Sequence, residues 1–540
     1  MTADMDARLA IDTAVLLVYF VLIISIGLYM GRKEQDLKDF ALGGRAIPWW
    51  AILASLIAAE TSAGTFFGTP GEGFTHRNYT YLQLAIGTII ARILVSYIFI
   101  KPYYDYKVYS IYEYLTARFG VATKNAASAV FMITRLLASG ARLYFAAIAL
   151  ALAYEMISGA KPDQTQTLWI YVGSTTAIVI LTAIYTTLGG IKAVIWTDLI
   201  QASIMIGSAL AALTLLYLAI PGGWSEIVAR QGSFHVSDFI TTGLDPARHG
   251  WQKIVGMFAV EYTIFAGLFG STFITMGTHG TDQDMVQRML TAPDVRRSRR
   301  SVILSGLADI PIAFTFISIG LLLWVYYQAH PDPTLPKTPN ETFCHFILYQ
   351  MPVGLRGLLI AGIFATAMGS LSTAINALAT SFTRDWYEPY INPNATSEQS
   401  LHAVRRATIW FSLLMIVVAS ATSYCVILRP NLRIIPIALG IFGYTYGSLL
   451  GVFFCGIFTK RCGNDFGNIL AMIVGFIVVV ILSGLPNNIA GVFGTQFYTQ
   501  PSWLPVMEFP WWICFGSIVT FSVAILFRTR ADISRAARTE

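Results

Sequence analysis

Four ionisable side chains interrupt long apolar stretches of the sequence: Glu60, Asp198, Arg135 and Arg142. A charged side chain that faces lipid costs at least about 2.5–3.5 kcal/mol, so each of them needs a cavity or a partner. Carboxylate oxygens suit a small cation, whereas a desolvated guanidinium binds a carboxylate through paired hydrogen bonds. Arg135 and Arg142 are two helical turns apart and therefore share one helix face. These residues predict either a polar binding site or buried ion pairs, for example between Glu60 and Arg142.

Two of the apolar stretches contain runs of small and polar residues, AAETSAGTFFGTPG at 58–71 and GLFGSTFITMG at 267–277. Within a bilayer, unpaired backbone is tolerated only where it is buried in protein or lines a water-filled cavity. The two runs are five apolar segments apart, so they cross the membrane in opposite directions. Paired broken helices of this kind indicate an inverted repeat with a binding site between its halves. Small residues that simply let helices pack closely are the alternative explanation.

Membrane-spanning helices are the elements that must position these residues. The 540-residue chain is 55% hydrophobic and only 12% charged, with a mean hydropathy of +0.61, whereas a soluble domain carries about 25% charged residues. Long continuous apolar runs predict helices and exclude a β-barrel, so the expected fold is an all-α polytopic membrane protein. About thirteen segments are long enough to cross a bilayer, at residues 10–30, 48–74, 80–102, 124–157, 166–188, 192–219, 250–277, 299–327, 353–384, 399–428, 432–457, 464–484 and 505–528.

Basic residues are concentrated in every second connection between these segments. The stretch 288–300 and the tail after Arg528 are the richest examples. By the positive-inside rule, this pattern predicts a multi-pass inner-membrane protein with its N-terminus outside and its C-terminus in the cytoplasm. The topology also explains the net charge of +6, so no nucleic-acid partner is expected.

No low-complexity linker divides the chain, which predicts one transmembrane domain over residues 1–540. The five cysteines form no C-x-x-C pair, so neither a disulfide framework nor a cysteine metal site is predicted. The expected partners are membrane lipid and a small solute, and the expected state is a monomer. Core repeats are predicted at about 48–219 and 250–457, with additional helices at about 10–30, 464–484 and 505–528.

Four local motifs resemble those of one known family. They are DFALGGR at 39–45, SLIAA at 55–59 continuing to FFGTPG at 66–71, YTTLGGIKAVIWTDLIQ at 185–201, and DQDMVQR at 282–288. The chain is similar in these motifs to the bacterial sodium/solute symporters, which include sodium–galactose, proline and sialic-acid carriers. This resemblance implies a five-plus-five inverted repeat with discontinuous helices, in which segments two to six and seven to eleven form the halves.

The resemblance also implies a sodium site between the broken second segment and the ninth segment. Its ligands would be the carbonyls of Ala58 and Thr61 together with Thr366, Gly369 and Ser370. The chain departs from the family here, because Gly369 stands where a serine is common and one hydroxyl is lost. A second Na⁺ site, present in some members, would use Asp198, Ser372 and Thr373.

The solute site implied by the resemblance lies beside the same break. Its candidate residues are Glu60, Thr65, Gln83, Arg135, Arg142, Thr275 and Thr278. Gln83 resembles a substrate contact of the sialic-acid carriers. The arginines suit an acidic solute, whereas Glu60, Gln83 and the hydroxyls suit a neutral sugar, so both classes stay open.

The predicted function is sodium-coupled secondary active symport of a small organic solute, a sugar or an acidic sugar such as sialic acid, with Na⁺ as the coupling ion. A carrier for a monocarboxylate or an amino acid, a proton-coupled carrier and a passive channel are the alternatives. An enzyme is not expected, because no metal-protease, nucleophile-elbow or phosphate-loop motif is present.

Overall fold

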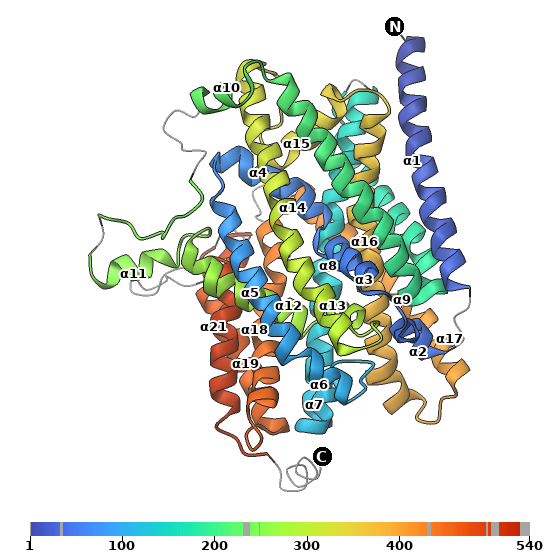
Figure 1. Cartoon of the computed structure of the whole chain (residues 1–540), viewed down its shortest axis with the longest axis vertical. Helices are drawn as coiled ribbons and strands as arrows, with labels where there is room; N and C mark the ends of the chain where they lie inside the picture. Colours follow the sequence, from blue (N-terminus) through green and yellow to red (C-terminus); the bar gives the residue numbers. More distant parts are fainter. Residues whose placement is uncertain are drawn as a thin grey trace.

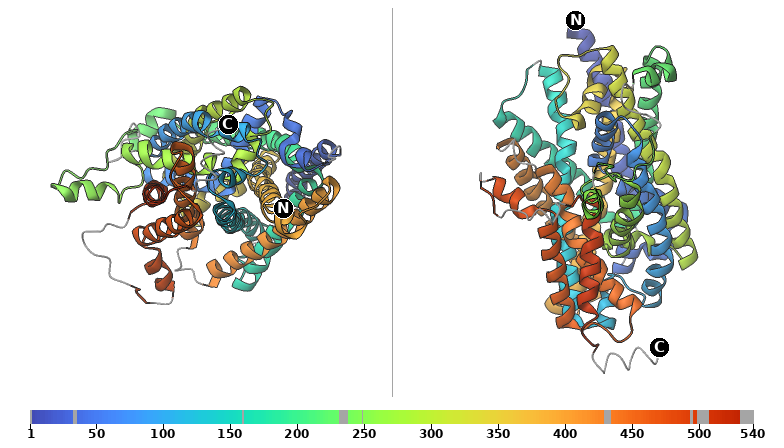
Figure 2. Two further views of the ribbon diagram at one scale, coloured as in Figure 1. Left: turned by 90° about the horizontal axis from the view of Figure 1, so that it is seen from below. Right: turned by 90° about the vertical axis from the view of Figure 1, so that its left-hand side faces the viewer.

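The computed structural model describes residues 2–32, 36–158, 160–230, 238–247, 249–428, 434–492, 495–497 and 507–529. Within these ranges all regular secondary structure is helical, apart from one isolated bridge between Cys462 and Arg528. The predicted all-α fold is therefore confirmed. Figure 1 shows the helices running mostly along the long axis of the molecule, and Figure 2 shows the same bundle from two further directions.

Nine helices of the described chain are long and apolar enough to cross a membrane, or ten if a bent pair is counted as one further span. The bent pair joins α2 and its 3₁₀ extension η1 (Leu37–Arg45) to α3 (Trp49–Glu60) at 114°. The long helices are α1 (Thr2–Gly31), α5 (Gln83–Ile98) with α6 (Ile100–Asp105), α8 (Val121–Ser158), α9 (Gln164–Ala219), α14 (Val295–Ala329), α16 (Leu355–Phe382) with its π-helical continuation η4 (Thr383–Ile391), α17 (Ser397–Leu428), α18 (Ile434–Phe458) and α19 (Asp465–Leu482).

This number is smaller than the thirteen predicted segments because the backbone divides the chain differently. The predicted segments 166–188 and 192–219 form one continuous element, α9, whose only non-helical residue is Gly190 (φ 50°, ψ −150°). At about 1.5 Å per residue, the 56 residues of α9 are far too long for one crossing of about 30 Å. Figure 1 places α7 (Glu113–Arg118), just before α8, at the bottom and α10 (Gly223–Arg230), just after α9, at the top. Gly190 is therefore the point at which α9 turns back.

The helix break predicted at 58–71 is present, whereas the run 267–277 is continuous helix and its segment is interrupted earlier, at 258–263. The segment 48–74 consists of α3 and α4 (Ala63–His76), which are separated at Thr61 and Ser62. The segment 250–277 begins with α11 (Trp251–Met257) and continues, after an irregular stretch, as the π-helix η3 (Ala266–Ser271) and α12 (Thr272–Gly280). The last predicted segment contains only the short apolar helix α21 (Pro510–Ala524).

The central helix of the bundle is α16. Its most apolar window is 83% buried, whereas that of the peripheral helix α1 is 17% buried. Residues 361–369 and 371–381 of α16 are buried without exception. The two hydroxyl-bearing turns from Thr366 to Thr373 therefore lie in the interior of the protein.

Several helix pairs touch backbone to backbone through glycines, among them α5 with η3 and α4 with α14. A Cβ atom added at Gly87 of α5 would lie 2.0 Å from Gly267 O of η3. A Cβ atom added at Gly73 of α4 would lie 2.3 Å from Ile317 O of α14, and one added at Gly320 would lie 1.9 Å from Pro70 O. These glycines are required for close approach.

We expect Gly87→Ala to lower the free energy of unfolding by about 3 kcal/mol, because overpacking at a backbone contact forces the two helices apart. Thermal unfolding of the purified protein measures the loss. Gly207→Ala in α9 is the matched control, since no atom lies within 4 Å of the added methyl group, and alanine is the better helix former by about 1 kcal/mol. Equal melting temperatures for the two variants would contradict the close contact.

Candidate functional site

Three oxygen atoms from two helices, α3 and α9, converge on the bare face of Gly369 in α16. A Cβ atom at Gly369 would lie 3.1 Å from Gln201 Oε1 and 3.6 Å from both Ala58 O and Asp198 Oδ1. Ala58 belongs to the last turn of α3, just before the helix break, and Asp198 and Gln201 are one turn apart on α9. The helix break thus brings a backbone carbonyl to a carboxylate and an amide oxygen.

Two of these oxygens have no hydrogen-bond donor in the described part of the chain. Asp198 and Gln201 are at most 1% exposed, and Asp198 Oδ1 and Gln201 Oε1 have no partner. The other carboxylate oxygen of Asp198 accepts a hydrogen bond of 2.5 Å from Ser55 Oγ and lies 3.7 Å from Arg288 Nε. Buried oxygens without a donor are costly unless a cation binds them. The donor set of one carboxylate, one amide oxygen and one carbonyl fits Na⁺.

The α16 residues predicted to bind sodium lie on the turns around Gly369, whereas Thr61 lies in the break between α3 and α4. The hydroxyls of α16 donate to carbonyls of their own helix, Thr366 to Ile363 and Ser370 to Thr366. Ser372 donates to Gly369 O and Thr373 to Ser370 O in the same way. Each hydroxyl oxygen keeps a lone pair for a cation. Gln201 was missed by the sequence analysis, although its i+3 spacing from Asp198 places both on one helix face.

A small cavity of about 200 Å³ lies on the other side of the break in α3 and α4. Four of the predicted residues line it: Glu60, Thr61, Thr65 and Thr275. Further hydroxyls and carboxylates of the lining are contributed by Thr69, Tyr81, Thr88, Ser271 and Asp309. This lining offers many hydrogen-bond partners for a solute that carries hydroxyl groups.

Two buried side chains that were absent from the predicted site contact the carboxylate of Glu60, and one of them, Arg92, supplies the compensating charge. Glu60 Oε2 accepts a hydrogen bond from Arg92 Nη2, and Glu60 Oε1 lies 2.8 Å from His279 Nε2. Arg92 is fully buried and also donates to Ser305 Oγ of α14. The pairing of Glu60 with Arg142 that the sequence allowed is therefore wrong. Asp309 of α14 was missed as well, although it is a single acid in an apolar segment.

Arg135 and Arg142 lie together on α8 but outside the lining of this cavity. Arg135 Nη2 donates a hydrogen bond to Asp282 Oδ2, and Arg135 Nη1 lies 3.0 Å from Asp284 Oδ2. Both guanidinium groups lie over the ring of Phe442, at 4.9 Å and 4.5 Å from its centre, which confirms that they share a helix face. Arg135 is thus one member of a buried ion-pair network.

Gln83 and Thr278 also lie apart from the cavity lining. Gln83 Nε2 donates to Thr80 O and Tyr262 O, and its Oε1 accepts from Thr241 N. The amide thus ties the start of α5 to the stretch 238–247. Thr278 Oγ1 donates to Ile274 O of its own helix and lies 3.0 Å from His279 Nδ1.

Comparison with known proteins identifies the family of this chain. The model of the sodium:solute symporter family matches residues 40–475. The sodium/sialic acid symporter SiaT of Proteus mirabilis is 30% identical over 87% of this chain and 88% of its own length. The sodium/sialic acid symporter NanT of Aliivibrio fischeri is 28% identical over 89% of this chain and 90% of its own length.

The chain belongs to the sodium:solute symporter family. A solved structure of a substrate-bound, outward-open Na⁺-coupled sialic acid symporter covers 96% of the chain and 97% of its own, with 26% identity and a TM-score of 0.76. The broken helix and the oxygen cluster described above are thus features of a member of the sodium:solute symporter family. At Gly369, where the motif resemblance implied the loss of a hydroxyl, the amide oxygen Gln201 Oε1 lies close to the bare face of the residue.

Proposed function

We propose that this protein couples the entry of Na⁺ to the uptake of a small organic solute. The single observation that carries the proposal is the convergence of Ala58 O, Asp198 Oδ1 and Gln201 Oε1 at Gly369, with two of these buried oxygens lacking a donor. Membership of the sodium:solute symporter family supports Na⁺ as the ion. We propose that the carbonyl of Thr61 with Thr366 and Ser370 completes the shell of this ion, and that Ser372 and Thr373 hold a second Na⁺ together with Asp198.

The coupling follows from the position of the break between α3 and α4. Ala58 faces the proposed ion site, whereas Glu60 and Thr61, only a few residues later, line the solute cavity. An ion that fixes the end of α3 also fixes these two cavity residues. Since coupling free energies are reciprocal, solute binding must strengthen Na⁺ binding by the same factor.

The proposed solute is a sugar or an acidic sugar such as sialic acid. The hydroxyl-rich cavity supports a polyhydroxylated molecule, and two relatives are sodium/sialic acid symporters. Glu60, Thr65 and Thr275 are the proposed solute contacts. Gln83, Arg135, Arg142 and Thr278 lie outside the cavity lining, so they could contact the solute only in a conformation with a larger cavity. We propose further that the protein is a monomer in the inner membrane with its N-terminus outside. It would cross the membrane thirteen times and contain a five-plus-five inverted repeat. In this arrangement α9 supplies two crossings.

Uptake of radiolabelled sialic acid, glucose or galactose into proteoliposomes tests the proposal. We expect accumulation of one of these sugars only with an inward Na⁺ gradient, because the ion site holds α3 in its binding conformation. For a neutral sugar, accumulation should increase with an inside-negative potential, since each charge moved is worth about 2.3 kcal/mol per 100 mV. Proteoliposomes with K⁺ in place of Na⁺ are the control. Equal uptake driven by a proton gradient without Na⁺ would contradict sodium coupling.

A further inference from the structure

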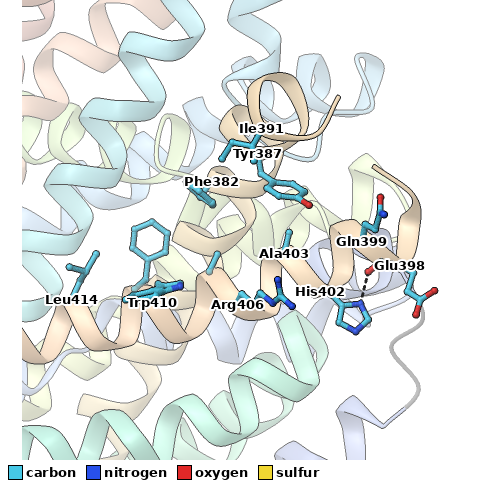
Figure 3. A pocket seen from close by; sticks show the side chains of 12 residues that line it. Phe382, Tyr387, Ile391, Glu398, Gln399, His402, Ala403, Arg406, Trp410 and Leu414 are labelled. Carbon is cyan, nitrogen blue, oxygen red and sulfur yellow. Dashed lines mark hydrogen bonds between the residues drawn. The ribbon is translucent and has the colours of Figure 1, made fainter. Parts of the chain in front are cut away.

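A large groove lies far from the solute cavity, between η4 and the first half of α17. Its volume is about 710 Å³. Figure 3 shows Tyr387 and Ile391 of η4 on one wall and a row of side chains of α17 on the other. The small residues Ala403 and Ala407 line the groove between the larger side chains and leave it open.

The wall formed by α17 has an ordered sequence of side chains. Glu398, His402, Arg406, Trp410 and Leu414 follow one another along the helix at intervals of four residues (Figure 3). Residues at this spacing share one helix face. The row therefore passes from an acid, through two basic side chains, to an aromatic and an aliphatic side chain over about 24 Å of helix.

The apolar end of this row faces lipid. Trp410 is 67% exposed and Leu414 is 43% exposed, and the neighbouring Ile409 and Val417 are 50% and 63% exposed. Large apolar side chains that are this exposed on a membrane-spanning helix indicate the lipid-facing surface. A tryptophan at the end of such a surface is typical of the headgroup level of a bilayer.

The polar end of the row carries charges that the described protein leaves without counterions. Neither the guanidinium of Arg406 nor the carboxylate of Glu398 makes a hydrogen bond or an ion pair with the described residues, and both residues are exposed. The other acid of the groove's surroundings, Glu388, is already bound by Arg384 and by Ser400. His402 uses Nδ1 to contact Glu398 O and leaves Nε2 available.

We propose that this groove binds one glycerophospholipid with an ethanolamine headgroup. Read from water towards the bilayer centre, such a lipid presents an ammonium group, a phosphate, ester groups and an acyl chain. Glu398 matches the ammonium, Arg406 and His402 match the phosphate, Trp410 lies at the esters, and Leu414 with Phe411 contacts the chain. A phosphatidylglycerol headgroup lacks the cation for Glu398, and a choline headgroup has no N–H to donate to it.

The lipid would connect two helices that matter for transport. The wall opposite α17 is η4, the continuation of α16, which carries Gly369 and the hydroxyls near it. A ligand that binds only the folded arrangement of η4 and α17 stabilises that arrangement by mass action. Ethanolamine lipid should therefore raise the melting temperature of the whole protein in the absence of any solute.

Native mass spectrometry of the full-length, delipidated protein tests the site. The probes are phosphatidylethanolamine, phosphatidylcholine and phosphatidylglycerol with identical acyl chains, each added in mixed micelles. We expect one ethanolamine lipid to bind about tenfold more tightly than the other two, as charge-assisted hydrogen bonds would provide. Arg406→Gln should remove the tight site, and Glu398→Gln should bring phosphatidylglycerol to the affinity of phosphatidylethanolamine.

Arg461→Gln is the matched control. Arg461 is exposed and follows α18, and because α17 and α18 run in opposite directions it lies on the same membrane side as Arg406. This change should leave the lipid affinities unaltered. Equal affinity for the three lipids in the native protein, or an equal loss in Arg461→Gln and Arg406→Gln, would overturn the proposal. If Arg406→Gln does not fold, the change of preference in Glu398→Gln decides it.

Discussion

Asp198→Asn is expected to raise the Na⁺ concentration for half-maximal uptake by about a hundredfold, which corresponds to about 2.7 kcal/mol. The change keeps the size of the side chain and one oxygen but removes the negative charge from the oxygens around Gly369. The negative charge of a carboxylate inside the membrane strongly stabilises a bound cation, so its removal should weaken Na⁺ binding. Flux measurements in proteoliposomes, and the Na⁺ dependence of the melting temperature, measure the loss directly.

The same experiment separates binding from folding. In Asp198→Asn the neighbouring Arg288 still has Asp284 as an ion-pair partner, with 2.8 Å between Arg288 Nη1 and the carboxylate. The melting temperature without Na⁺ should therefore change little. Asp332→Asn removes an acid from the exposed loop between α14 and α15 (Pro339–Gln350) and serves as the control. An unchanged Na⁺ requirement in a well-folded Asp198→Asn protein would place the ion site elsewhere.

Arg92→Gln is expected to destabilise the protein by about 3–5 kcal/mol, the usual cost of leaving one partner of a buried ion pair uncompensated. Arg92 is fully buried between Glu60 and Ser305, and Glu60 would keep only His279 as a partner. Solute binding should be lost together with stability, because Glu60 lines the cavity. Thermal unfolding and the yield of monodisperse protein provide the measurement.

The double variant Glu60→Gln with Arg92→Gln should be more stable than Arg92→Gln alone, since it removes both charges of the pair. Coupled partners show this non-additivity, whereas independent sites do not. Arg142→Gln is the control. Arg142 is also in the membrane interior, but it lies over the ring of Phe442 rather than beside a carboxylate, so adding Glu60→Gln to this variant should not restore stability. A double variant no more stable than Arg92→Gln would show that Glu60 and Arg92 are not energetically coupled.

The sequence was sufficient for the fold class and for the helix break at Thr61, because both follow from local chemistry. Charge-poor apolar runs require lipid-facing helices, and the polar run around Thr61 cannot continue as a lipid-facing helix. The number of separate helices was harder to predict from the sequence. Hydropathy separates 166–188 from 192–219 but contains no information on the backbone angles at Gly190, which let one element turn back.

Residue types and spacing identified part of the site, and contacts between helices decided the rest. Glu60, Thr65 and Thr275 do line a cavity, and Asp198 does lie beside Gly369. Arg92 was as visible in the sequence as Arg135, since both are single charges in apolar segments. Which of the arginines neutralises Glu60 depends on how α3 and α5 both pack against α14, and a single sequence does not contain that packing.

The glycine contacts between helices determine how the solute cavity can open. Helices that touch through backbone atoms have no side chains at the contact that could change rotamer, so each pair moves as a rigid body. One pair, α5 and η3, supplies Leu84, Thr88 and Ser271 to the cavity; the other, α4 and α14, supplies Thr65 and Ile312. The cavity is thus bordered by two closely packed helix pairs. We expect it to widen when the pairs move apart, which must break the hydrogen bond from Arg92 of α5 to Ser305 of α14.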